Sequence, residues 1–185
     1  MTGRLAIDDV QPSIDGGRYP TKAVVGEVVP VSAVVWREGH DAIAATLAVR
    51  GPADDPESAG RLVRIPMVPG TEPDTFHATF SPTSVGAWTY RVEAWSDPVA
   101  TWRHAVTAKA DAGQDTAELA NDLEVGARIF EKAAKGAPRG NRPALLAVAV
   151  SLRSDRPLAE RIAPAFSPDV TEILRAHPLR ELVTR

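Results

Sequence analysis

The sequence contains no cysteine among its 185 residues, which excludes a disulfide framework, a thiolate metal site and a cysteine nucleophile. No apolar run is long enough to span a bilayer, and residues 1–9 lack the apolar core of a signal peptide. The net charge is only −3, so the basic surface that nucleic acid or an anionic membrane requires is missing. The four histidines are scattered without metal-ligand spacing. We therefore expect a cytoplasmic globular protein with no metal, no cofactor, no nucleic-acid partner and no membrane partner.

What the sequence does have is apolar alternation with a period of two over its first half. The clearest case begins at Val29, where Val29, Val31, Ala33 and Val35 share one face of a predicted strand. The opposite face is also mostly apolar, which favours a central strand, although Pro30 removes one hydrogen-bond donor and argues mildly against this. Similar short segments begin at residues 5, 43, 63 and 76.

The stretch from Gly86 to Val106 carries three of the four tryptophans and is predicted to be a hairpin. Residues 88–95 alternate between apolar and polar, Ser96–Pro98 has the composition of a turn, and residues 102–107 alternate again. With the earlier segments this makes about seven antiparallel strands. The pattern predicts an immunoglobulin-like β-sandwich over residues 1–110.

After Asp111 the apolar spacing becomes helical, and we expect a small α-helical domain of about four short helices over residues 111–185. Gly136 is placed to end the first helix, and Asn141 to cap the second. Ser167-Pro168-Asp169 is a helix start signal: a cap, a proline at the first position and a negative charge in the first turn. The partly apolar tail 179–185 ends without a stop signal, so we expect it to dock onto something or to continue in a longer chain.

Few residues point to catalysis. His40-Asp41 could orient an imidazole, but no nucleophile pattern accompanies the pair, and the favoured interpretation is a loop pair that caps the next strand. The segment 51–60 has no apolar anchor, and we expect a solvated, mobile loop in which the acidic run 54–57 is exposed.

The tryptophans suggest a second kind of site. Trp95, Asp97 and Arg103 lie close together along the predicted hairpin, and an exposed indole beside such polar groups could stack on a sugar ring. The alternative for Trp88 and Trp102 is burial in the core, because aromatic side chains bury the largest areas in a small sandwich. For Trp95 a protein interface is as good an explanation as a sugar platform.

Four segments in order carry a family resemblance: Val34–Asp41, Val92–Pro98, Thr101–His104 and Ala176–Thr184. Together they closely resemble the N-terminal region of bacterial alpha-1,4-glucan:maltose-1-phosphate maltosyltransferases, over nearly the whole chain. The resemblance implies a β-sandwich and a helical domain ahead of an α-amylase-type barrel. It also implies a homodimeric retaining glycosyltransferase that transfers maltosyl units from maltose 1-phosphate to α-1,4-glucan, with these N-terminal domains helping to form the subunit contact.

The sequence also departs from that family, because it ends before any barrel. The family's nucleophilic Asp and acid/base Glu lie on the barrel, so no position here can inherit those roles. We therefore expect a catalytically inactive region that serves dimer assembly and shapes the glucan-binding surface. The residues proposed to contact glucan or a partner are His40, Asp41, Trp95, Asp97 and Arg103. The alternative is a stand-alone glucan-binding or protein-interaction module.

Overall fold

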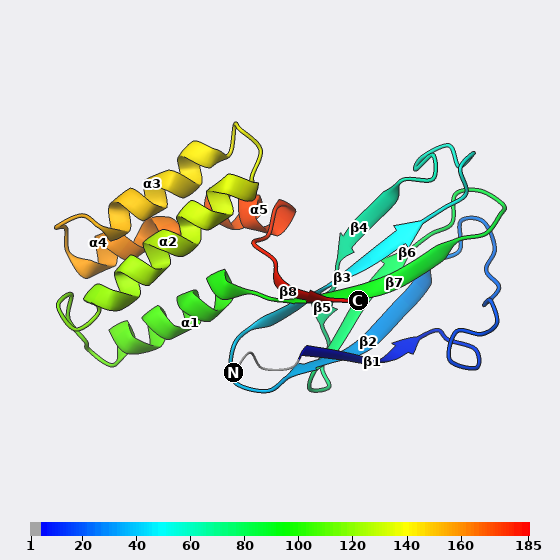
Figure 1. Ribbon diagram of the computed structural model, residues 1–185, viewed down its shortest axis with the longest axis horizontal. Helices are drawn as coiled ribbons and strands as arrows, with labels where there is room; N and C mark the ends of the chain where they lie inside the picture. The colour runs from blue at the N-terminus through cyan, green and yellow to red at the C-terminus, as the bar shows by residue number, and fades with distance from the viewer. Residues whose placement is uncertain (1–4) are drawn as a thin grey trace. The chain divides into compact units, whose positions relative to one another are not determined.

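The computed structural model describes residues 5–185 (Figure 1). Residues 1–4, part of the N-terminal stretch in which we expect no signal peptide, lie outside the described range. The elements in chain order are β1 (Leu5–Gln11), β2 (Val29–Arg37), β3 (Ile43–Arg50), β4 (Leu62–Pro66), β5 (Val68–Pro69), β6 (Thr75–Phe80), β7 (Thr89–Ser96), α1 (Pro98–Asp111), α2 (Ala120–Gly136), α3 (Arg142–Leu152), α4 (Leu158–Ile162), the 3-10 helix η1 (Ala163–Phe166), α5 (Pro168–Ala176) and β8 (Glu181–Thr184).

The strands form two four-stranded sheets, with the orders β1-β2-β6-β5 and β4-β3-β7-β8. As predicted, β2 is a central strand, and Pro30, its second residue, lies opposite Thr79 of β6. The first order corresponds to strands A, B, E and D of an immunoglobulin-type sandwich, which favours that interpretation of the topology.

One hydrophobic core lies between the two sheets. The alternation along β2 buries Val31, Ala33 and Val35, and these side chains pack in the same cluster as Leu47 of β3 and Val92 of β7. Because side chains alternate across a strand, each sheet covers the apolar face of the other. The predicted β-sandwich followed by helices is confirmed.

The second half of the predicted hairpin is wrong, because residues 98–111 form helix α1. Asp97 caps the helix by accepting a hydrogen bond from the Ala100 N–H at 2.9 Å, and Pro98 occupies the first turn. Val99, Trp102 and Val106 are buried on one face of the helix. Trp102 and Val106 fit an alternating strand but are also four residues apart and so share one helix face, whereas His104 is exposed. The Asp97-Pro98 cap signal is the stronger one.

The chain forms two compact units, one of residues up to Ser96 together with Leu182–Arg185, and the other of Asp97–Glu181. The helical unit is thus inserted in the sequence between β7 and β8. Figure 1 shows β8, in red, beside β7 in the second sheet, so the partly apolar tail completes the sandwich.

Helix ends follow the predicted signals at most positions. Helix α2 ends at Gly136, and the Ser167 hydroxyl accepts from the Val170 N–H at 3.4 Å at the start of α5. Asn141 differs: it precedes α3, but its side chain makes no capping hydrogen bond. Its backbone is helical, whereas a side-chain cap needs the extended backbone that Ser167 has.

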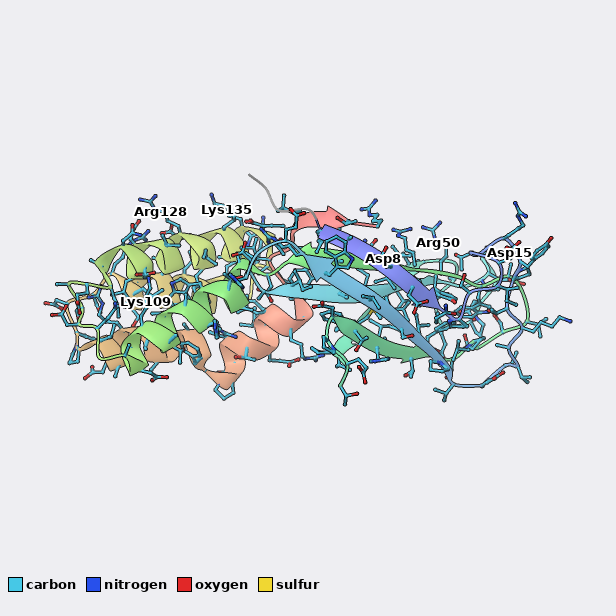
Figure 2. All side chains as sticks on the ribbon, turned by 90° about the horizontal axis from the view of Figure 1, so that it is seen from below. Asp8, Asp15, Arg50, Lys109, Arg128 and Lys135 are labelled. Carbon is cyan, nitrogen blue, oxygen red and sulfur yellow. The ribbon has the colours of Figure 1, made fainter. Side chains whose placement is uncertain are left out.

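The helical unit has its own core around Phe130 of α2. Figure 2 shows Arg128 and Lys135 on the polar side of the same helix, which is therefore amphipathic. Lys109 of α1 reaches Asp122 of α2 at 2.7 Å. The other large, fully buried side chains of this core are Val106, Leu119, Leu123, Leu145, Val148 and Leu152.

The segment 51–60 differs from the expected solvated loop at Asp55, whose side chain is only 2% exposed. Its carboxylate accepts hydrogen bonds from the Ser58 N–H at 2.7 Å, from the Ser84 hydroxyl at 2.8 Å and from the Thr83 hydroxyl at 2.5 Å. A polar anchor thus replaces the missing apolar one, while Asp54 and Glu57 are exposed as predicted.

Candidate functional site

Trp95 lies on the face of β7 that points away from the sandwich core, beside Ala44 of β3. The ring is nevertheless only 5% exposed, and its Nε1 donates to the Thr46 hydroxyl at 3.3 Å. Stacking on a sugar needs an open ring face. Trp95 therefore offers neither a sugar nor a partner protein an accessible surface in the described chain.

Asp97 and Arg103 are both built into the start of the helical unit. Burial raises the pKa of Asp97. It outweighs the hydrogen bond from Ala100 and the charge of Arg103, both of which lower the pKa. Arg103 donates to the Ala165 carbonyl and to the Thr171 hydroxyl, the latter at 3.3 Å, and its guanidinium lies 5.5 Å from the Phe166 ring centre. Burial lowers the pKa of Arg103. The two side chains influence each other electrostatically, and Arg103 ties α1 to η1 and α5.

His40 and Asp41 lie in the exposed loop between β2 and β3. Asp41 pairs with Arg37 at 2.7 Å, and Arg37 also donates to the Ser96 hydroxyl at 2.6 Å. Within residues 5–185 no hydrogen bond joins His40 to Asp41, so the structure does not assemble an oriented imidazole there. Asp41 alone ties this loop to Arg37 of β2.

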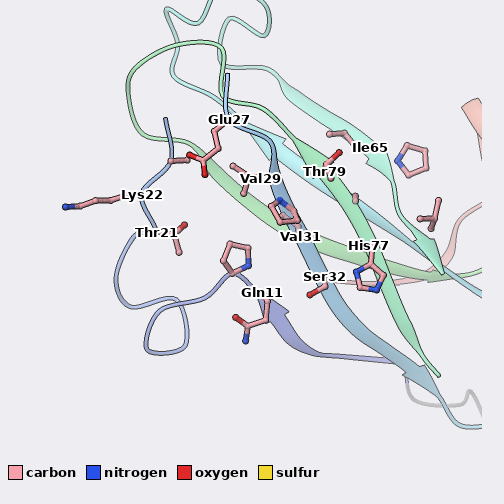
Figure 3. A pocket seen from close by; sticks show the side chains of 16 residues that line it. Gln11, Thr21, Lys22, Glu27, Val29, Val31, Ser32, Ile65, His77 and Thr79 are labelled. Atoms are coloured by element: carbon pink, nitrogen blue, oxygen red, sulfur yellow. The ribbon is translucent and has the colours of Figure 1, made fainter. Parts of the chain in front are cut away.

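A hollow of about 790 Å³ lies along the first sheet (Figure 3). Gln11, Ser32 and His77 come from the adjacent strands β1, β2 and β6 and occupy one register row. Thr79 and Thr21 add further hydroxyl groups to the lining. These side chains supply the hydrogen-bond donors and acceptors that a polyhydroxylated ligand needs.

Trp36 is the most exposed tryptophan, at 36%, and its Nε1 donates to Asp8 of β1 at 2.7 Å. It lies on β2 two positions beyond Val34 and four beyond Ser32, and so on the same outer side of the sheet. Trp36 is not among the site residues proposed from the sequence, although it falls on the face of β2 opposite Val31 and Val35. The feature of the sequence that could have identified it is a single bulky aromatic residue near the end of an otherwise small-residue strand face.

Helix α3 carries an exposed apolar face. Leu146 is 44% exposed and Val150 is 71% exposed, and no charged residue interrupts the helix between Arg142 and Arg153. Pro143, in the first turn of the same helix, is also exposed. A helix that is apolar all round is normally buried, so this face has the character of a contact surface.

Within residues 5–185, no group of three or more His, Asp or Glu side chains is arranged to hold a metal ion. None of the helices described there is long and apolar enough to cross a membrane.

Residues 3–185 match the protein family described as alpha-1,4-glucan:maltose-1-phosphate maltosyltransferase, domain N/S. The chain is 56% identical to the alpha-1,4-glucan:maltose-1-phosphate maltosyltransferase of Corynebacterium glutamicum, 54% to that of Corynebacterium pseudotuberculosis and 50% to that of Mycobacterium tuberculosis. Each match covers 100% of this chain but only 27%, 27% and 29% of the respective relative. The chain therefore spans less than a third of the length of these proteins.

Proposed function

Because the chain belongs to the domain N/S family of alpha-1,4-glucan:maltose-1-phosphate maltosyltransferases, we propose that it is the non-catalytic N-terminal part of such an enzyme and serves subunit assembly. The parent enzyme would act in the cytoplasm and transfer maltosyl units from maltose 1-phosphate to α-1,4-glucan. The transfer chemistry belongs to the remaining part of that protein. The purified 185-residue chain is expected to transfer no maltosyl units.

The observation that carries the assembly role is the exposed face of α3. Leu146 and Val150 lie one helical turn apart, and their exposed surface gains free energy when it leaves water. A second copy of the chain presents the same face, so a two-fold contact would bury α3 against α3. We therefore propose a homodimer in which α3 forms the subunit contact.

The test measures the mass of the chain by sedimentation velocity over a concentration series. The wild-type chain is expected to dimerise, and the double variant Leu146→Glu/Val150→Glu to stay monomeric with an unchanged circular dichroism spectrum. Val85→Glu is the matched control, because Val85 is 88% exposed on the other unit. A wild-type monomer at all concentrations, or a double variant that still dimerises, contradicts the proposal.

A second role, contact with the glucan, is favoured by the hollow of Figure 3 and the exposed Trp36 on the same side of the sheet. The hydroxyl, amide and imidazole groups of the hollow, together with Lys22 and Glu27 of the same lining, suit the hydroxyl groups of a sugar chain, and Trp36 lies four residues beyond Ser32 on the same face of β2. Titration with maltooligosaccharides should change the tryptophan fluorescence of the wild type. The response should be lost in Trp36→Ala and retained in Val63→Ala, a surface change on β4. A response retained in Trp36→Ala removes this role.

A further inference from the structure

The outer face of the second sheet is rich in arginine. Ala48 of β3 faces away from the core, because Leu47 and Val49 on either side of it pack inside the sandwich. The strand register places Arg64 of β4 and Arg91 of β7 directly opposite Ala48, one on each side. The two arginines therefore flank a small, buried residue in a single row that crosses three strands.

A third arginine lies one step further along the same face. Arg50 is two residues after Ala48 on β3 and is exposed, and Figure 2 shows it at the surface of the sandwich unit. Two residues along a strand span about 7 Å, and neighbouring strands lie about 4.8 Å apart. The backbone positions of Arg50, Arg64 and Arg91 thus form a triangle with sides of roughly 8–10 Å.

A buried carboxylate holds two of these side chains in place. Glu93 of β7 is fully buried and accepts from Arg91 at 2.8 and 3.1 Å and from Arg64 at 3.2 Å. Both arginines are nevertheless about half exposed. Their guanidinium groups are therefore oriented before any partner arrives, which lowers the conformational entropy that binding would cost.

The positive charge of this face exceeds its negative charge. Glu93 is the one acidic residue in β3, β4 and β7. Arg64 reaches Glu93 through Nε, and within residues 5–185 its two terminal nitrogens have no acceptor. The Arg50 guanidinium makes no hydrogen bond or ion pair in the described part of the chain. Since a guanidinium can donate two parallel hydrogen bonds to a carboxylate, these unused donors favour an acidic partner.

The spacing of the arginines matches the repeat of an extended peptide. Side chains on one face of an extended chain recur at every second residue, about 7 Å apart, which is also the step from the Arg64–Arg91 row to Arg50. We propose that this face docks an extended segment of a partner protein that carries acidic side chains at alternate positions. One carboxylate lies between Arg64 and Arg91, above Ala48, and the next one meets Arg50. The surface contains no residue of α3, so it stands or falls separately from the proposed dimer contact.

Fluorescence anisotropy tests the proposal with a labelled, capped nine-residue peptide of alternating serine and glutamate, titrated with the 185-residue chain. The wild-type chain should bind this peptide more tightly than a peptide with the same four glutamates in a row. It should not bind the version in which glutamine replaces glutamate. Added salt should weaken the binding, because exposed ion pairs are screened.

Two variants locate the binding on this face. Arg50→Gln and Arg64→Lys should each weaken it about fivefold, the upper end for one exposed ion pair. Arg64→Lys keeps a cation beside Glu93 but loses the planar guanidinium, so the sheet should stay intact by circular dichroism. Arg156→Gln, at an exposed position between α3 and α4, is the matched control and should bind as the wild type does.

Each contrary result overturns the proposal. Equal affinity for the peptide with consecutive glutamates removes the match in spacing, and equal affinity for a single-stranded oligonucleotide of the same charge makes this a general anion surface. Binding that survives both Arg50→Gln and Arg64→Lys lies elsewhere. Absence of saturable binding at millimolar concentration shows that the face docks no acidic segment. If Arg50→Gln instead abolishes self-association of the chain in sedimentation velocity, the occupant of this face is a second copy.

Discussion

The indole of Trp102 on α1 lies directly against Gly126 on α2. A Cβ built on Gly126 would stand 2.6 Å from the indole Nε1 and closer still to two of its ring carbons. The same Nε1 donates to the Asp122 carbonyl at 2.7 Å, and the ring meets Phe130 edge-on at 5.7 Å. Glycine at position 126 is therefore what allows α1 and α2 to pack through a tryptophan.

Gly126→Ala is expected to destabilise the helical unit by about 1–3 kcal/mol, because overpacking a rigid contact costs this much while alanine's better helix propensity recovers only part of it. Urea unfolding followed by circular dichroism measures the loss. Gly136→Ala is the matched control, since nothing lies within 4 Å of a Cβ there, and it should be neutral or slightly stabilising. Equal effects of the two substitutions would contradict the packing explanation.

Asp97→Ala removes the cap of α1 and should cost about 1 kcal/mol, the usual value for a lost N-terminal cap. Asp97→Asn keeps the capping oxygen and serves as the control. Because burial raises the pKa of Asp97 above its ordinary 3.8, the folded state holds this proton more strongly than the unfolded state does. Any stabilisation from this group is present below pH 3.8 and is lost as pH rises through the folded pKa. The free energy of unfolding of the wild type should therefore fall relative to that of Asp97→Asn as the pH rises through this range. A difference that does not change with pH would contradict the raised pKa of Asp97.

Arg153 joins the end of α3 to α2 through Glu124, at 2.7 and 3.1 Å, and through Glu131. Hydrogen bonds from Arg153 and then Arg128 lower the pKa of Glu124 to about 2. The stabilisation that comes from this lowered pKa is present above pH 4.5, the ordinary pKa of a glutamate, and disappears as the pH falls toward 2.

Arg153→Gln should lower the melting temperature slightly at pH 7, since these groups are partly exposed and screened. The difference from wild type should vanish near pH 2 and shrink with salt, as measured by calorimetry. Arg139→Gln, at an exposed position before α3, should show no such pH dependence. A difference that persists at pH 2 would mean that Arg153 acts through packing instead.

Asp55→Ala should loosen the segment 51–60, because the hydroxyls of Thr83 and Ser84 and the Ser58 N–H lose their shared acceptor. Burial by itself would raise the pKa of Asp55, but these hydrogen bonds outweigh it and lower the pKa, so the carboxylate is charged at neutral pH. Cleavage after Glu57 by a glutamate-specific protease should become clearly faster. Asp54→Ala, on the exposed neighbour, should leave the rate unchanged, and a resistant Asp55→Ala chain would show that the anchor is dispensable.

Much of the architecture follows from local patterns in the sequence. The period of two along β2 predicts which side chains enter the sandwich core, and Ser167-Pro168 predicts where α5 begins. These signals are reliable because each one depends on a few neighbouring residues. The prediction for residues 102–107 failed where two periods overlap: Trp102 and Val106 fit both an alternating strand and one face of a helix.

The candidate sites were predicted less well, because exposure is a property of the whole fold. Trp95 and Trp36 both lie on outward faces of strands, yet one is buried and the other is open. Asp55 belongs to an acidic run with the composition of a solvated loop, but Thr83 and Ser84, 28 and 29 residues later, make it an anchor. No local pattern contains those contacts.

The sequence by itself determined the family, the β-sandwich and most helix boundaries, because periodicity, caps and family motifs are written in consecutive residues. Only the tertiary structure decided that the last strand, β8, completes a sheet whose other strands lie before the helices, and that the Tyr90 hydroxyl reaches the Pro12 carbonyl. Those relationships join segments roughly 70 or more residues apart. They depend on which surfaces come together when the two sheets bury their apolar faces.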